Sequence, residues 1–195
     1  MTDFLLRFKL FRGIRSVFRS LNNLRHKPIR KFKSWLYHQL HDSAYEEYVE
    51  KVKSIYKIHR SVRIGYGTIV AGSGSIEIGE DSYIGYNSFM AADPSTAKII
   101  IGKHCSMSHN IHIRTQKHVR KMFYKDELEA PIQGADIVIG DYVWIGANVY
   151  INGGVNLGEN SIIGANSVVT SDIPPNTIYG GAPARLIRNK SDYID

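Results

Sequence analysis

His118 is the residue of this chain best suited to accept a proton from a hydroxyl group. It lies in a polar segment, residues 114–136, whose last part contains Pro131 and Gly134. Because an imidazole titrates near neutrality, a histidine held against an alcohol can act as a general base, which contributes about 10²–10⁴ in rate. A lone histidine in a loop is ordinarily a solvated surface residue, so the case for His118 depends on the elements that position it.

The sequence that follows this segment repeats an aliphatic residue every six positions. The repeating residues are Ile139, Ile145, Ile151, Leu157, Ile163 and Val169, and Gly follows most of them. A step of six fits neither the period of a helix nor that of a strand, but it fits a chain that closes a triangular coil every eighteen residues. The period predicts an all-β solenoid. A Gly-rich β-sandwich, the alternative, would show strict alternation and irregular turn spacing.

The same repeat continues upstream with breaks in phase. Its members there are Ile64, Val70, Ile76, Ile78, Ile84, Met90, Ile101, Met107 and Ile113. The residue two positions earlier is often small or β-branched, as at Val62, Thr68, Ser82, Ser88, Ile111, Val143, Val149, Ser161 and Ser167. This pattern is typical of short strands that turn both positions inward.

The repeat is interrupted twice. Residues 91–98 contain about five extra residues, and Ile139 follows Ile113 by 26 positions, eight more than one coil. A rigid solenoid with one long polar loop carries function on that loop more often than on its coils. We therefore expect residues 114–136 to form a protruding functional loop.

Length and composition predict one domain with an appendage: a helical extension over residues 1–60 and a solenoid over residues 61–190. The chain is 43% hydrophobic and 22% charged, as in ordinary globular proteins. The single cysteine, Cys105, excludes an intramolecular disulfide and is compatible with the reducing cytoplasm. It lies in a strand-like segment, which predicts a buried, inert thiol. No segment approaches the roughly 18 apolar residues of a membrane span.

The positive charge is concentrated at the N-terminus. Residues 1–41 hold ten Lys or Arg against one acid, whereas the whole chain carries a net charge of +7. Residues 4–21 predict an amphipathic helix, with a second helix over residues 34–54 and Pro28 ending or restarting the first. Such a basic helix can lie peripherally on an anionic membrane, or pack its aromatic face on the solenoid or on another subunit. No recognisable nucleic-acid module accompanies the charge, so no nucleic acid is expected.

Residues 137–147, with the sequence IVIGDYVWIGA, and the run that follows to Arg188 resemble the hexapeptide-repeat acetyltransferases. The likeness covers residues 62–190 and is greatest to galactoside and maltose O-acetyltransferases and to those of bacterial surface-polysaccharide synthesis. It implies a left-handed parallel β-helix, assembled as a homotrimer with active sites between subunits. It also implies acetyl-CoA as co-substrate and a saccharide or glycan hydroxyl as acceptor, as in capsule, O-antigen or exopolysaccharide biosynthesis.

The resemblance also implies roles for individual residues. His118 stands sixteen residues after Gly102, as the family's catalytic histidine follows its Ile-Gly pair. Positions that match the coenzyme groove are Ala147, Ala165, Thr170, Arg185 and Arg188. Positions similar to those that bind the acceptor are Asn87, Asp93 and Trp144, although Gly85 occupies the place of the family's Asn.

Other readings of the sequence remain open. The γ-class carbonic anhydrases space two histidines as His104 and His109 are spaced here, but Tyr86 and Asp81 stand where a third ligand would be needed. No metal is therefore expected. A small free sugar or a xenobiotic is an alternative acceptor, and a non-enzymatic scaffold is an alternative of another class.

Overall fold

The structure, a computed structural model, describes residues 27–94, 96–117 and 133–193. The chain divides into two compact units, residues 1–47 and 48–195. Helix α2, Lys27–Ile55, runs through the boundary between the units and covers the predicted second helix. Pro28 stands in its first turn, where a missing N–H group breaks no helical hydrogen bond. The predicted helix over residues 4–21 lies outside the described residues.

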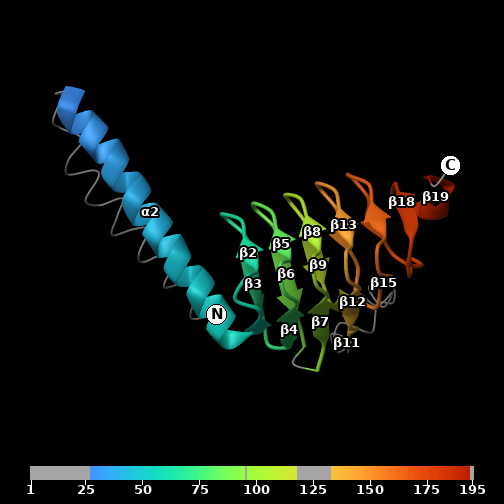
Figure 1. Cartoon of the computed structure of the whole chain (residues 1–195). Helices are drawn as coiled ribbons and strands as arrows, with labels where there is room; N and C mark the ends of the chain where they lie inside the picture. The colour runs from blue at the N-terminus through green and yellow to red at the C-terminus, as the bar shows by residue number, and fades with distance from the viewer. Residues whose placement is uncertain (1–26, 95, 118–132, 194–195) are drawn as a thin grey trace, which may run out of the picture. The chain divides into compact units, whose positions relative to one another are not determined.

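The second unit is a three-sided parallel β-solenoid, which confirms the predicted fold (Figure 1). Sheet A contains β1 Lys57–Ile58, β4 Ser75–Ile78, β7 Lys98–Ile101, β12 Ile137–Ile139 and β15 Asn156–Leu157. Sheet B contains β2 Arg63–Ile64, β5 Tyr83–Ile84, β8 Ser106–Met107, β13 Trp144–Ile145, β16 Ile162–Ile163, β18 Thr177–Gly180 and β19 Arg185–Asn189. Sheet C contains β3 Ile69–Gly72, β6 Phe89–Ala92, β9 His112–Arg114, β14 Tyr150–Ile151 and β17 Val168–Val169. The chain visits A, B and C in turn, so each coil has three edges: A–B, B–C and C–A.

The extra residues of the long coils all leave the solenoid at the C–A edge. Register pairs residues 18 apart between the last coils, but 23 apart where residues 91–98 intervene and 38 apart where the long loop intervenes. The predicted excess of eight residues after Ile113 is therefore wrong. Ile113 and Ile139 lie on adjacent faces, sheets C and A, so the step between them is one corner plus twenty inserted residues.

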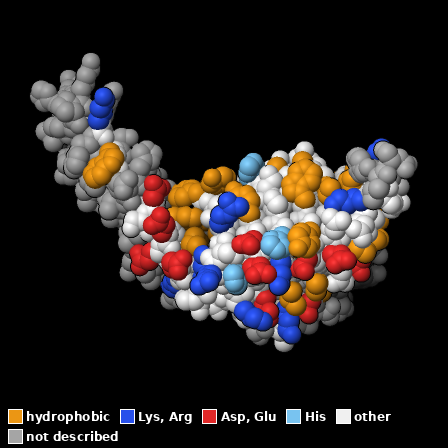
Figure 2. All heavy atoms as spheres, viewed as in Figure 1, with side chains coloured by type: hydrophobic (Ala, Val, Ile, Leu, Met, Phe, Trp, Pro, Cys, Tyr) orange, Lys and Arg blue, Asp and Glu red, His pale blue; other side chains and the backbone are white. Residues whose placement is uncertain are grey.

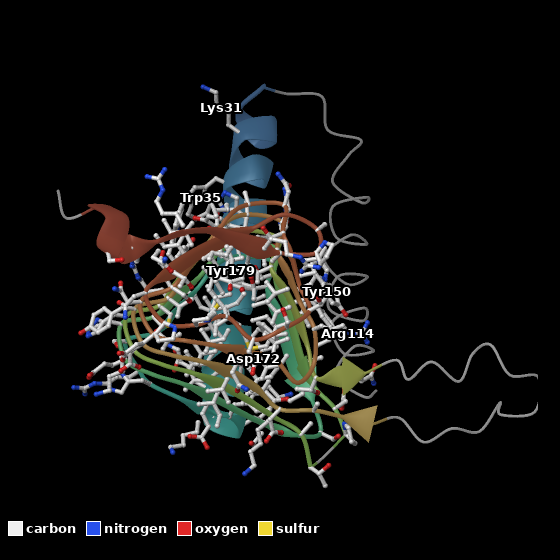
Figure 3. The ribbon with its side chains drawn as sticks, turned by 90° about the vertical axis from the view of Figure 1, so that its right-hand side faces the viewer. Lys31, Trp35, Arg114, Tyr150, Asp172 and Tyr179 are labelled. Atoms are coloured by element: carbon white, nitrogen blue, oxygen red, sulfur yellow. The ribbon has the colours of Figure 1, made fainter. Side chains whose placement is uncertain are left out.

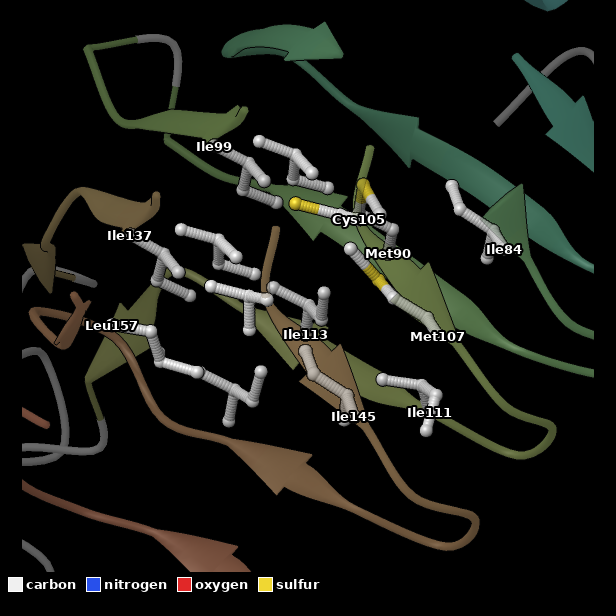
Figure 4. Packing of buried hydrophobic residues seen from close by; sticks show 14 of the residues in the cluster. Ile84, Met90, Ile99, Cys105, Met107, Ile111, Ile113, Ile137, Ile145 and Leu157 are labelled. Carbon is white, nitrogen blue, oxygen red and sulfur yellow. The ribbon is translucent and has the colours of Figure 1, made fainter. Parts of the chain in front are cut away.

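The interior is filled by the two inward positions of every strand. The six repeating residues from Ile139 to Val169 are each at most 2% exposed, and the residues two positions earlier are also buried. Figure 4 shows these aliphatic side chains stacked along the interior, with Cys105 and Met107 among them. Burial of each large aliphatic side chain contributes about 1.5–3 kcal/mol, so the stack is the main source of stability.

Buried hydroxyl groups connect one coil to the next. The Thr68 hydroxyl donates to the Gly85 carbonyl (2.7 Å) and accepts from the Ser88 amide (3.1 Å). The Ser82 hydroxyl bonds in the same way to Gly102 O and Cys105 N. These bonds explain why small polar residues occupy some of the inward positions: the buried hydroxyls of Thr68 and Ser82 are paired, whereas that of Ser161 finds no partner among the described residues.

Asparagine occupies many of the corners. Asn87, Asn110, Asn148 and Asn166 hold φ between 55° and 60° on the B–C edge, a conformation that asparagine tolerates better than other residues with a Cβ. Their side chains also form a ladder, in which Asn110 donates to Asn148 and Asn148 donates to Asn166, each at 3.0 Å. The corners are thus stabilised both by local conformation and by contacts between coils.

Both ends of the solenoid are capped. At the first coil, Val52 of α2 is buried in the core, and the Tyr56 hydroxyl donates to the Gly72 carbonyl at 2.9 Å. At the last coil, β18 and β19 form an antiparallel hairpin, and the Val168 amide donates to the Gly181 carbonyl at 3.0 Å. The 3-10 helix η2, Lys190–Tyr193, follows the hairpin. Capping is required because a terminal coil has a neighbour on one side only.

Two adjacent isoleucines test which positions support the coils. Ile163 is 0% exposed, whereas Ile162 is half-buried on the outer face of β16. We expect Ile163→Ala to lower the free energy of unfolding by about 2–5 kcal/mol, because it leaves a cavity in the stack. Ile162→Ala is the matched control and should lower the free energy of unfolding clearly less. Urea unfolding of both variants measures the difference, and equal losses would contradict the assigned inward face.

Candidate functional site

The base of the long loop lies on the C–A edge, against the other insertion. Strands β10, Gln116–Lys117, and β11, Gln133–Gly134, pair antiparallel where the loop leaves and returns. A Cβ atom at Gly134 would collide with Pro94, so β11 passes directly over residues 91–98. The two interruptions of the repeat therefore form one structural feature. His118 follows β10 by one residue and lies outside the described residues.

Asp93 is held firmly at this edge. Its carboxylate oxygen Oδ1 accepts hydrogen bonds from the amide and the hydroxyl of Ser73, at 2.9 and 3.0 Å. Its backbone N–H donates to the buried hydroxyl of Thr115 (2.8 Å), which in turn donates to the Asp93 carbonyl at 2.6 Å. Oδ2 accepts no hydrogen bond from the described residues, so half of the carboxylate remains available to a ligand.

The B–C edge carries a column of residues in register. The carbonyls of Tyr66, Tyr86, His109 and Ala147 accept hydrogen bonds of 2.8 to 3.0 Å from the asparagine amides of the next coil. Ala147 and Ala165 are the last two corner residues of this column, and within the described residues their own N–H groups donate no hydrogen bond. Small side chains and open amides make this part of the edge suitable for an extended ligand that contains amide groups.

The remaining predicted coenzyme residues lie near the capping hairpin. Arg185 pairs with Gly180 and Arg188 with Ile178, and both side chains are exposed. The Val168 amide donates to the Gly181 carbonyl, which places Gly181 at the B–C edge one coil beyond Ala165. Arg185 pairs with Gly180, the residue before Gly181, so it continues the line of the B–C edge. Thr170 is exposed after β17, on the C–A side of sheet C.

The structure brings together only part of the predicted site. Asn87, Ala147, Ala165 and Arg185 share the B–C edge, but Asp93 and Thr170 lie across sheet C at the C–A edge. Trp144 is 50% exposed on the outer face of sheet B, which lies opposite the C–A edge in a three-sided coil. One chain therefore cannot place Trp144 and Asp93 against the same small molecule.

The histidines considered as metal ligands lie on separate edges. His104 stacks on Tyr142 at the A–B edge, with ring centroids 5.0 Å apart. His109 contacts Tyr86 at the B–C edge, at 6.1 Å. Over residues 27–94, 96–117 and 133–193, no three His, Cys, Asp or Glu side chains gather in a group that could hold a metal ion. Within one chain, His104 and His109 do not form a shared site.

Sequence reasoning missed a group of side chains on the outer face of sheet C. Phe89, His112 and Tyr150 stand in register on neighbouring strands, and Arg114 lies over the Phe89 ring. Figure 3 shows Arg114 and Tyr150 on the side of the solenoid from which β10 and β11 project. The sequence could have predicted that these side chains face outward, because each residue is next to a buried residue of the six-residue repeat, and neighbouring residues of a strand point to opposite faces.

Cys105 is buried and unpaired, as predicted. It occupies the inward position that Ser82 and Ser161 occupy in other coils, and its thiol lies 3.1 Å from the Gly140 carbonyl. Burial raises the pKa of the Cys105 thiol above its usual value. The protonated, enclosed sulfur is not available as a nucleophile.

The parallel solenoid, with the loop base at its C–A edge, has the architecture of the hexapeptide-repeat β-helix proteins. Residues 136–171 match the family described as bacterial transferase hexapeptide (six repeats). A hexapeptide-repeat-containing acetyltransferase of Vibrio cholerae, solved in complex with acetyl coenzyme A, is 34% identical with a TM-score of 0.53, over 65% of this chain and 70% of that one. The chain belongs to the hexapeptide-repeat acetyltransferases, whose β-helix is left-handed.

Two curated relatives are also similar. The galactoside O-acetyltransferase of Escherichia coli K12 is 30% identical over 60% of this chain and 56% of its own length. The polysialic acid O-acetyltransferase of Escherichia coli O1:K1 is 36% identical over 68% of this chain and 42% of its own length. The chain thus spans about half the length of the curated relatives that it matches.

The environment of Cys105 predicts its reactivity. A free cysteine with a pKa of about 8.5 is partly thiolate at pH 8, but burial keeps the Cys105 thiol protonated there. We expect no alkylation by iodoacetamide at pH 8 in the native protein, and complete alkylation in urea, as measured by intact mass. Rapid labelling of the folded protein would contradict the buried placement.

Proposed function

We propose that this protein is an acetyl-CoA-dependent O-acetyltransferase that transfers an acetyl group to a saccharide hydroxyl in the biosynthesis of a surface polysaccharide. Relatives named for galactosides and for polysialic acid act on saccharides, which supports this class of acceptor. Acetyl-CoA as donor is supported by the acetyl coenzyme A complex of the Vibrio cholerae relative.

The observation that carries the proposal is the open stretch of the B–C edge. The N–H groups of Ala147 and Ala165, which donate to no acceptor among the described residues, lie one coil apart, about 4.8 Å, and Arg185 follows in the same line. The pantetheine arm of the coenzyme carries two amides and ends in phosphates. The carbonyl groups of these amides can accept hydrogen bonds from the N–H groups of this edge. The phosphates are negatively charged and can pair with the guanidinium groups of Arg185 and Arg188.

The active protein is proposed to be a homotrimer. Trp144 and Asp93 face opposite sides of one solenoid, so they can serve one site only where two copies meet. In a closed ring of three copies, the C–A edge of each chain, which carries the loop, would meet the B–C edge of its neighbour, which is proposed to bind the coenzyme. This arrangement would bring His118, Asp93 and Asn87 to the acceptor and Trp144 to the thioester end of the coenzyme.

In the proposed mechanism the acceptor attacks acetyl-CoA directly within a ternary complex. His118 takes the proton of the sugar hydroxyl while its oxygen bonds to the thioester carbonyl carbon. A backbone N–H group, such as that of Ala147, donates to the developing oxyanion. The carbon–sulfur bond then breaks, and His118 returns the proton to the coenzyme thiol. The products are an O-acetylated saccharide and free coenzyme.

Replacement of the proposed base tests the mechanism. We expect His118→Ala to lower kcat about 10²–10⁴-fold with KM for acetyl-CoA unchanged, because it removes proton transfer but not coenzyme binding.

His104→Ala is the matched control, since His104 lies on the A–B edge and should not affect turnover. The assay is release of coenzyme thiol against a panel of free sugars, nucleotide sugars and glycan fragments. Unchanged activity of the His118 variant would remove the proposed base. No consumption of acetyl-CoA with any acceptor would instead favour a non-enzymatic scaffold, and use of small free sugars alone would move the acceptor away from polysaccharides.

The basic N-terminal segment is proposed to hold the protein at the cytoplasmic face of an anionic membrane. None of the described helices is long and apolar enough to cross a bilayer. Acidic and basic side chains are intermixed on the face of the solenoid shown in Figure 2. Residues 42–195 hold 15 Lys or Arg against 17 Asp or Glu, so the positive excess belongs to residues 1–41. Peripheral attraction through Lys and Arg is worth about 1 kcal/mol per residue near an anionic surface.

Deletion of residues 1–30 tests the membrane proposal. We expect the truncated protein to stop sedimenting with vesicles that contain an anionic lipid, while the full chain sediments with them at low salt and is released as salt rises. Vesicles of neutral lipid are the control and should bind neither protein. Equal sedimentation of both proteins, or a lower melting temperature of the truncated solenoid, would favour packing of the segment within the protein.

A further inference from the structure

The outer face of sheet C beside the loop base carries four side chains of complementary chemistry: Phe89, His112, Arg114 and Tyr150, here called the sheet C patch. We propose that the sheet C patch binds an acidic saccharide, with the Arg114 guanidinium paired to a carboxylate of the acceptor. This inference rests on the proposed acetyltransferase function and specifies its substrate class. It is carried by the geometry of Arg114.

The members of the sheet C patch are held in register by the coils. Phe89 pairs with His112, and His112 pairs with Tyr150, so the three side chains form one row across neighbouring strands. The rings of Phe89 and His112 lie 6.2 Å apart and are tilted by 32°. Phe89 and Tyr150 are half-buried and His112 is exposed, so the row presents apolar ring surface to the C–H face of a sugar, and the His112 and Tyr150 side chains offer hydrogen-bonding groups to its hydroxyls.

Arg114 is fixed in place but not fully satisfied. Its guanidinium carbon lies 5.5 Å from the Phe89 ring centroid, and one terminal nitrogen donates to Gln116 Oε1 at 3.2 Å. Its Nε is buried and has no hydrogen-bond partner in the part of the chain that the structure describes. A buried N–H group of a cation without an acceptor is costly, and such groups often mark a place where an absent ligand binds.

The geometry of the guanidinium selects the ligand. Nε and a terminal nitrogen along one edge of the planar guanidinium form a fork that matches the two oxygens of a carboxylate. The Phe89 ring on one face holds that plane against the patch. An arginine immobilised in this way recognises a planar oxyanion better than a flexible lysine could.

A phosphate of the coenzyme is the other oxyanion that Arg114 could bind, but Arg114 lies far from the residues proposed to hold the coenzyme phosphates. Arg185 and Arg188, the cations that suit those phosphates, lie on the capping hairpin beyond β17. Arg114 lies on β9, with β14 and β17 between, so the two positions are separated by at least two coil steps, about 10 Å. Arg114 instead adjoins β10, which leads to His118, and so lies near the proposed acceptor end of the site.

The test compares an acidic saccharide with its own methyl ester, which keeps the shape and removes the charge. We expect the wild type to prefer the acid, and Arg114→Gln to lower kcat/KM for the acid about 10–100-fold through KM, with values for the ester and KM for acetyl-CoA unchanged. Arg114→Lys keeps the charge but not the fork and should give an intermediate loss. Arg63→Gln is the matched control, because Arg63 lies over the Tyr83 ring at 5.3 Å on sheet B.

Other outcomes overturn the inference in distinguishable ways. Equal losses with acid and ester, or a lower melting temperature of Arg114→Gln, would show a structural role, and a raised KM for acetyl-CoA would assign Arg114 to the coenzyme. A changed assembly mass would make the sheet C patch a contact between subunits. Equal use of acid and ester by the wild type, with Arg114→Gln unaffected, overturns this inference alone, whereas absence of acetyl transfer to every saccharide overturns the proposed function.

Discussion

Coil-to-coil hydrogen bonding in fixed register is the constraint on which this molecule depends. Within each of the three sheets, an inner strand pairs with the strand one coil before and one coil after it, so it cannot shift without breaking two interfaces. A shift of one residue would also turn the buried aliphatic side chains outward. Because register is fixed at every coil, each edge becomes a column of equivalent residues, such as the one that runs from Tyr66 to Ala165.

The same constraint decides where the chain can change. A face of two inward positions cannot accept an extra residue, but a corner can, and both long insertions occur at the C–A edge. There they pack on each other: the hydroxyl of Thr115 bonds to Asp93, and the carbonyl of Thr115 accepts from the Ala135 amide. The loop that carries His118 therefore starts and ends on a rigid base, as is typical of functional loops on stiff scaffolds.

Chemistry is divided among the edges and faces of the solenoid. The B–C edge offers backbone amides and, beyond them, the exposed guanidinium of Arg185. The C–A edge offers the Asp93 carboxylate, whose Oδ2 accepts no hydrogen bond from the part of the chain that the structure describes, and sheet C between the two edges offers aromatic rings and Arg114. Since Trp144 faces away from the C–A edge, one chain does not bring it to Asp93, and the proposed site would need a second copy of the chain.

The six-residue repeat by itself determined the fold and the burial of residues such as Ile145 and Cys105, because any chain with that period has only one way to turn the same positions inward. The roles of His118, Ala147 and Arg185 came from resemblance and stay predictions. Only the tertiary structure showed that residues 91–98 and the long loop share one edge, and that the loop adds twenty residues and not eight. It also showed that Arg114 lies over Phe89 with a buried Nε that has no partner among the described residues. These facts depend on contacts between residues 20 to 40 positions apart, and a period along the chain does not record which coils meet at a corner.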